Sequence, residues 1–328
     1  MPAGTLLTST PIVRLAEDVE DKIYNFRPTD TPLISSVSRV TVEGVFHEWT
    51  ADTYRAPNAA NAAAEGADAT FSTAAQPDTY GNRTQIIQDT ISVSGTAEAV
   101  KKYGRKSEKA RLKTKKMIEL KKDQEASSIS SAVSVIAAGA TAGRMRGLYG
   151  FIATNSLFGA GGASPNPVTN TAPTVGTLRA FAEADLQTTI RNVYERGGDA
   201  EVLMVSPLHK VRVSSFTGNV QRTNEVNSGN GNRNAVRLQT SFSIYGHDFG
   251  ETKVVPNRIM TGSGAGLVNT AYVIDYDKVK VGQLRPWQSK DLAPIGDSDQ
   301  CQVLTEVTLV VPQESTLGVI RDLTLTGA

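Results

Sequence analysis

The feature that most constrains this chain is a stretch of 34 residues, 105–138, that contains neither glycine nor proline. Gly104 and Gly139 bracket it, and strong helix formers fill its first two thirds. The pattern predicts one long helix, which at 1.5 Å per residue would extend for roughly 50 Å. A helix of that length exceeds what a compact domain needs, so we expect the rest of the chain to be arranged along a rod.

The same region carries a strong charge asymmetry. Residues 101–123 hold 11 Lys and Arg against 3 Asp and Glu, a local charge of +8 in a chain whose formal total is +1. Residues 41–82 hold six acidic residues and a single basic one, Arg55, a local charge of −5. The near-neutral total gives no reason to expect a nucleic-acid-binding or membrane-surface protein. The basic helix has three open roles: a solvated face, non-specific phosphate contact, or a surface for an acidic partner.

The remaining elements follow from periodicity and turn residues. We expect an extended arm with one short helix over residues 1–40. A long hairpin should follow, with strands at 42–49 and 84–93 and an Ala/Asn-rich tip at 56–75, which is too long a loop to serve only its own domain. After the rod the predicted elements are a short strand (147–152), an amphipathic helix (177–196), a strand (201–205), a helix capped by Ser206, a polar loop (217–234), a turn (245–250) and strands at 272–281, 300–311 and 317–325, the last two forming a pair.

Chemistry-bearing motifs are scarce. No Gly-Lys dipeptide occurs, so a phosphate-binding Walker loop is excluded, and the three histidines, His47, His209 and His247, lack triad or zinc-motif partners. Two Asp-x-Asp pairs, at 275–277 and 297–299, could hold a divalent ion, but a strand edge and a turn explain them more simply. The lone Cys301 excludes an internal disulfide and indicates folding in a reducing compartment. We therefore expect no enzyme, no cofactor, no metal, no signal peptide and no membrane span.

The order of these elements resembles the Johnson fold of tailed-bacteriophage and herpesvirus major capsid proteins. Local sequence also resembles a podophage-like major capsid protein family within that fold. The similar segments include Tyr-Gly-His-Asp-Phe-Gly at 245–250 and Leu-Arg-Pro-Trp at 284–287, together with 32–33, 147–155, 205–210, 256–258 and 292–299. Each motif alone is weak, and their order carries the resemblance.

The resemblance implies an α+β fold with named parts. These are an N-terminal arm (1–40), an extended E-loop hairpin (41–100), a peripheral P-domain with the spine helix (101–171), an axial A-domain (172–260) and return strands of the P-domain (261–328). Some relatives in the fold join neighbours through an E-loop lysine. Because no lysine occurs between Lys22 and Lys101, we expect a shell without that isopeptide bond.

The resemblance also implies a function. The chain would be a structural subunit that self-assembles into the hexamers and pentamers of an icosahedral or prolate phage head. The head would enclose double-stranded DNA and be assembled in the host cytoplasm. The implied partners are a separate scaffolding protein, because the arm is too short to contain one, a portal, decoration proteins and non-specifically contacted DNA. The alternative within the fold is an encapsulin-like compartment shell. Outside it, a metal-dependent enzyme using the Asp-x-Asp pairs and a salt-sensitive DNA-binding protein are rival classes.

The charge patches predict contacts between copies, because a projecting hairpin cannot easily fold back on the helix that follows it. The predicted basic side is Lys106, Lys109, Lys113, Lys115 and Lys116, and the predicted acidic side is Glu43, Glu48, Glu65, Asp68 and Asp78. Glutamate at Lys113, Lys115 and Lys116 is expected to block assembly without unfolding the monomer.

Overall fold

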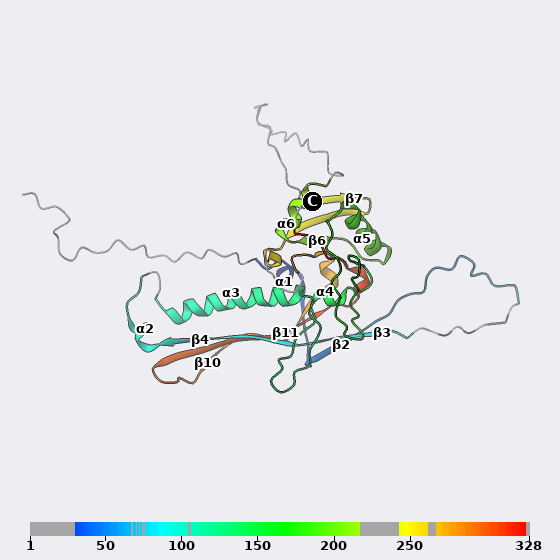
Figure 1. Cartoon of the computed structure of the whole chain (residues 1–328). Coiled ribbons are helices and arrows are strands. Elements are labelled where there is room, and N and C mark those ends of the chain that lie inside the picture. The colour runs from blue at the N-terminus through cyan, green and yellow to red at the C-terminus, as the bar shows by residue number, and fades with distance from the viewer. Residues whose placement is uncertain are drawn as a thin grey trace, which may run out of the picture.

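The computed structural model describes residues 30–325, apart from 67, 70, 72, 74, 75, 104, 105, 217–242 and 262–266. Figure 1 shows an elongated molecule, in which the long helix α3 (Glu108–Ile129) lies along a narrow sheet. In order, that sheet contains β1 (Ser38–Thr41), β10 (Lys280–Leu292), β11 (Ser298–Val310) and β4 (Gln85–Ser94). Strand β10 runs antiparallel to β11, and β11 runs antiparallel to β4. The short helix α2 (Gly95–Ala99) lies at the end of the molecule where α3 begins.

A second sheet forms a lobe on the side of α3 opposite the first sheet (Figure 1). Its order within the described residues is β5 (Ser156–Leu157), β12 (Gly318–Ile320), β9 (Ala271–Ile274), β6 (Val202–Val205), β8 (Gly250–Pro256) and β7 (Ile244–His247). The helices α5 (Glu183–Glu195) and α6 (Pro207–Ser214) contribute to the same lobe. The remaining short elements are α1 (Pro32–Ser36), α4 (Leu148–Phe151), η2 (Arg258–Thr261), η3 (Tyr276–Lys278) and η4 (Glu314–Thr316).

Strand β6 of the second sheet is buried on both faces. All four residues of β6 are buried, and successive side chains enter different cores. Leu203 and Val205 lie in the cluster that contains Leu186 and Ile190 of α5, whereas Met204 lies in the main core with Leu120 and Ile129 of α3. Because successive side chains of β6 point to opposite faces, this strand joins the core of the lobe to the core beneath α3.

The long hairpin is a separate two-stranded ribbon. Strand β2 (Phe46–Ala51) pairs with β3 (Asp78–Arg83), and the ribbon extends away from the body on the side opposite α2 (Figure 1). The predicted returning strand over 84–93 was wrong in one respect, because β4 pairs with β11 and not with the outgoing strand. The chain changes sheets at Thr84, whose hydroxyl donates to Glu306 Oε1 at 2.7 Å.

The predicted long helix exists but is shorter than 105–138. It begins after Ser107, whose side chain accepts from Ala110 N, and ends at Ile129 after 22 residues, roughly 33 Å. Ser130 turns out of the helix, with its hydroxyl donating to Ser127 O at 2.8 Å. Serine side chains compete for backbone groups in this way, and the absence of glycine alone could not reveal it.

Of the other predictions made from the sequence, the structure confirms some and contradicts others. The Ser206 cap and the turn between β7 and β8 are confirmed, and Gly197, at a φ of +79°, follows α5 as a helix stop should. The strand predicted over 147–152 is the helical turn α4, and the strand over 272–281 is interrupted by η3. The predicted C-terminal pair is wrong, since β11 and β12 belong to different sheets. The arm helix predicted before Arg27 and the loop predicted over 217–234 lie outside the described residues.

Candidate assembly interface

The tip of the β2–β3 ribbon exposes aromatic side chains. Residues 52–77 connect β2 to β3 without regular structure where they are described, and the side chains of Tyr54 and Phe71 are fully exposed. Water-exposed aromatic rings are costly on an isolated subunit and are enriched at protein interfaces. This loop therefore has the composition of a surface that is covered by another molecule.

The predicted acidic residues all lie on this hairpin or at its root. Glu43, Glu48, Glu65, Asp68 and Asp78 are exposed, and within the described residues none of them takes part in the ion pairs of α3. In Figure 1 the ribbon and the first turns of α3 extend in opposite directions. The acidic and basic patches of one subunit are therefore kept apart by the fold.

The predicted basic residues fall into two groups. Lys109 Nζ lies 3.0 Å from Asp291 Oδ1 and 3.4 Å from Asp299 Oδ1, and Lys116 Nζ lies 2.8 Å from Asp89 Oδ2. These two lysines hold the first half of α3 against its own sheet.

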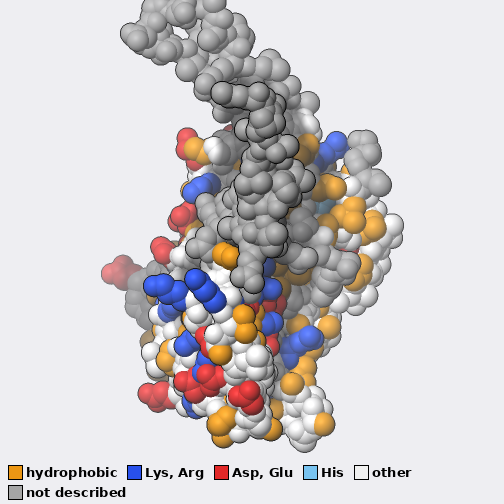
Figure 2. Space-filling model, turned by 90° about the vertical axis from the view of Figure 1, so that its left-hand side faces the viewer, with side chains coloured by type: hydrophobic (Ala, Val, Ile, Leu, Met, Phe, Trp, Pro, Cys, Tyr) orange, Lys and Arg blue, Asp and Glu red, His pale blue; other side chains and the backbone are white. Residues whose placement is uncertain are grey.

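The other three predicted lysines are arranged differently. Lys106 and Lys115 are exposed, and Lys115 has only a 3.8 Å contact with Glu119. Lys113 is half-buried, and its charge helps to lower the pKa of Asp291. Figure 2 shows basic and acidic side chains gathered in neighbouring groups on this end of the molecule. The outward lysines are the ones that a second molecule could reach.

The ion pairs of α3 predict a pH dependence. The hydrogen bond from Lys109 holds the pKa of Asp291 below its ordinary value, and Lys116 does the same for Asp89. A depressed carboxyl pKa gives stability that is present above the unfolded pKa, about 3.9, and is lost as pH falls through the folded pKa. We expect Asp291→Asn to lower the thermal unfolding midpoint at pH 7, and we expect this deficit to shrink as the pH falls below the unfolded pKa of about 3.9. A deficit that does not change between pH 7 and acid pH would contradict this pairing.

The root of the ribbon is fixed by a buried polar cluster that the sequence did not reveal. Asn82 of β3 is fully buried, and its Nδ2 donates to Leu309 O at 2.8 Å and to Arg146 O at 3.1 Å. Its Oδ1 accepts from Arg146 N at 2.7 Å. The Arg146 guanidinium, also buried, donates to Pro167 O at 2.6 Å and to Asn170 Oδ1 at 2.7 Å. Burial lowers the pKa of Arg146 to about 10.

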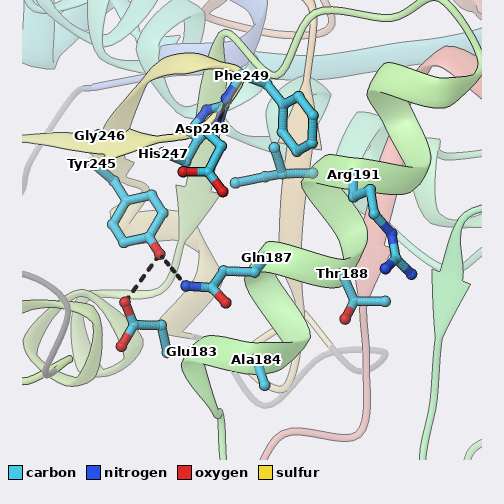
Figure 3. Close-up of a pocket in the computed structure, with 11 residues that line it drawn as sticks. Glu183, Ala184, Gln187, Thr188, Arg191, Tyr245, Gly246, His247, Asp248 and Phe249 are labelled. Carbon is cyan, nitrogen blue, oxygen red and sulfur yellow. Dashed lines mark hydrogen bonds between the residues drawn. The ribbon is translucent and has the colours of Figure 1, made fainter.

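A cavity of about 440 Å³ lies between α5 and the β7–β8 turn (Figure 3). The Tyr245 hydroxyl donates to Glu183 Oε1 at 3.1 Å and accepts from Gln187 Nε2 at 3.4 Å, while Asp248 and Phe249 line the other wall. Tyr245, Glu183 and Gln187 are thus hydrogen-bonded to one another, and no nucleophile with an adjacent base is arranged among the lining residues. We find no catalytic constellation in it.

The candidate metal pairs have structural roles. Asp275 Oδ1 accepts from Asp277 N at 3.0 Å and caps η3, and Asp299 faces Lys109. Within the described residues, no cluster of three or more His, Cys, Asp and Glu could hold a metal, and no helix is long and apolar enough to cross a bilayer. His209 is buried edge-on against Phe181, as a core residue would be.

Comparison with known proteins gives consistent matches. A family model described as SU10 major capsid protein matches residues 3–324. The major capsid protein of Escherichia phage Phieco32 is 25% identical over 226 residues, which are 59% of this chain and 64% of that protein. The chain thus spans slightly under two thirds of that curated relative.

Solved structures of similar fold include shells of two kinds. The capsid asymmetric unit of cyanophage A-1(L) has a TM-score of 0.65 at 16% identity, covering 94% of this chain and 97% of that one. The SrpI encapsulin complex of Synechococcus elongatus has a TM-score of 0.56 at 11% identity, covering 96% and 94%. At such identities the likeness establishes the fold. The Johnson fold expected from the order of elements is confirmed.

Proposed function

The chain belongs to the SU10 major capsid protein family, and from this premise we propose that it is the subunit from which a phage head is assembled. The observation that carries the proposal is the E-loop ribbon, which projects beyond the body and ends in exposed aromatic side chains. No described residue of its own subunit covers Tyr54 or Phe71. In a shell of identical subunits, the ribbon of one copy would lie over its neighbour, and many modest contacts would sum to a stable assembly.

Several finer features complete the proposal. The subunits form hexamers and pentamers of an icosahedral or prolate head around double-stranded DNA, with a separate scaffolding protein, a portal and decoration proteins as partners. Assembly takes place in the host cytoplasm, and the function needs no active site. We assign the arm to 1–40, the E-loop to 41–100, the P-domain to 101–171 and 261–328, and the A-domain to 172–260. The encapsulin reading shares the fold, but both the family model and the curated relative favour the phage head.

Electron microscopy of the purified chain, with and without a co-expressed scaffolding protein, tests the proposal directly. Closed shells or capsomer rings of uniform diameter are the expected result. Shells filled with a co-purifying enzyme in place of DNA would favour the compartment, and a monomer under every condition would refute shell formation.

The E-loop aromatic residues give a sharper prediction. Replacing Tyr54 and Phe71 together by serine should prevent shell formation, because buried aromatic anchors supply a large share of interface energy. The thermal midpoint of the unassembled subunit should not change, since both rings are fully exposed there. Val168→Ser, an exposed apolar residue on a different loop, is the matched control. Normal shells from the double variant would contradict a role for these two rings.

A further inference from the structure

A buried carboxylate joins three parts of the chain that are far apart in sequence. Glu125 of α3 is fully buried. Its Oε1 accepts hydrogen bonds from Leu33 N at 2.9 Å and from Asn257 Nδ2 at 2.8 Å, and its Oε2 accepts from Ile34 N at 2.9 Å. Leu33 and Ile34 belong to α1, at the root of the arm, and Asn257 links β8 to η2 at the base of the second sheet.

Helix α1 depends on this carboxylate for its first turn. Thr31 occupies its N-cap position but makes no side-chain capping bond. The first N–H groups of any helix lack partners within the helix and need an external acceptor when they are buried. Glu125 provides that acceptor to Leu33 and Ile34 from 92 and 91 residues away. The position of the arm root is thereby tied to the spine helix.

On the side of the second sheet, hydrogen bonds also fix the partner of Glu125, which is Asn257. Asn257 is fully buried, its N donates to Val205 O at 2.8 Å, and its Oδ1 accepts from Ile259 N at 2.9 Å. These bonds fix the amide so that Nδ2 faces Glu125. One carboxylate consequently accepts from the arm root and from the end of the second sheet at the same time.

Strand β1, which follows α1, is fixed to β10 in the first sheet, so residues 38–41 have a directional tie of their own. The further contacts close to α1 are weaker or less directional. Asp30 and Arg258 approach to 3.8 Å, but both are exposed, and such pairs contribute little. The side chain of Leu33 lies in the main core, and apolar packing does not by itself set a direction. Burial raises the pKa of Glu125 although all three hydrogen bonds lower it.

We propose that Glu125 is a positioning residue for assembly, whose shared carboxylate fixes the arm root, residues 31–37, relative to the A-domain. The part concerning assembly rests on the proposed function. The junction itself does not, because all of its atoms belong to one subunit.

Hydrogen exchange of the unassembled full-length chain tests the junction. Glu125→Gln keeps the size of the side chain but replaces one acceptor oxygen with an NH₂ group that faces a donor. We expect at least a tenfold faster exchange in the peptides 31–37 and 257–261, with 108–117 unchanged. Glu119→Gln, on the same helix but half-exposed, is the matched control. Unchanged exchange in both peptides overturns the proposal.

Two further measurements cover the remaining outcomes. Glu125→Asp keeps the charge but shortens the reach, and it should accelerate exchange in the same two peptides. If neither variant folds, the wild type decides: peptides 31–37 and 257–261 must open together under graded denaturant, and separate openings overturn a common junction.

The assembly role has its own readout. Shells of Glu125→Gln should vary in diameter under the microscope, while those of Glu119→Gln should be uniform, and uniform shells from both would overturn the positioning role. Failure of the wild type to form shells under any condition would count against the proposed function and leave the exchange result standing.

Discussion

Replacing Lys106, Lys115 and Lys121 by glutamate is expected to abolish shell assembly and to leave the subunit folded. All three side chains are exposed on or just before α3, and each replacement changes the charge by two, which takes the local +8 of residues 101–123 to +2. Complementary charge mainly governs encounter and register between molecules, so its loss should be most visible in assembly. Microscopy and sedimentation velocity measure the outcome, and arginine at the same three positions is the charge-preserving control.

The structure changes the choice of residues for this experiment. Lys116, which the sequence placed among the candidates, lies against Asp89 and Glu119 of its own subunit. Glutamate at that position would bring three carboxylates together and disturb α3 itself. An assembly defect from such a variant could not be assigned to contacts between copies.

A reciprocal exchange identifies the partner. Lysine at Glu43, Glu48 and Asp78 should block assembly when introduced alone, because the hairpin would then repel the basic helix of the next copy. Combining both sets of replacements should restore shells, since opposite charges again face each other. If the combined variant stays unassembled although each subunit is folded, the two patches are not partners.

The second large effect is expected on stability. Asn82→Leu should lower the free energy of unfolding of the region at the E-loop root by about 3 kcal/mol, because each buried backbone group left without a partner costs about 1–3 kcal/mol. The carbonyls of Arg146 and Leu309 and the N–H of Arg146 would lose their partner together. Chemical denaturation followed by tryptophan fluorescence measures the change, since Trp49 lies on the neighbouring strand.

Controls for Asn82 come from the same hairpin. Asn61→Leu replaces an exposed asparagine of the E-loop tip and should change stability by less than about 0.5 kcal/mol. Asn82→Asp keeps the shape but removes both amide donors, so it should be destabilising as well. A loss below about 1 kcal/mol for Asn82→Leu would show that water replaces the missing bonds.

Short-range patterns in the sequence determined much of this protein. The glycine-free, lysine-rich stretch gave a long helix, the Ser206-Pro207 pair gave the start of α6, and Gly197 gave the end of α5. Charge counts located an acidic hairpin and a basic helix. The order of elements was enough to indicate the capsid fold, which the family match and the similar structures confirm.

Only the tertiary structure decided which segments meet. The strand after Thr84 pairs with β11, more than 200 residues further along the chain. Lys109 and Lys116 of α3 face Asp291 and Asp89 of their own sheet, and their spacing along the helix does not reveal these partners. Asn82 and Glu125, likewise, look like ordinary polar residues in the sequence. Their importance comes from burial beside backbone groups that have no other partner, and local propensity carries no information about such long-range contacts.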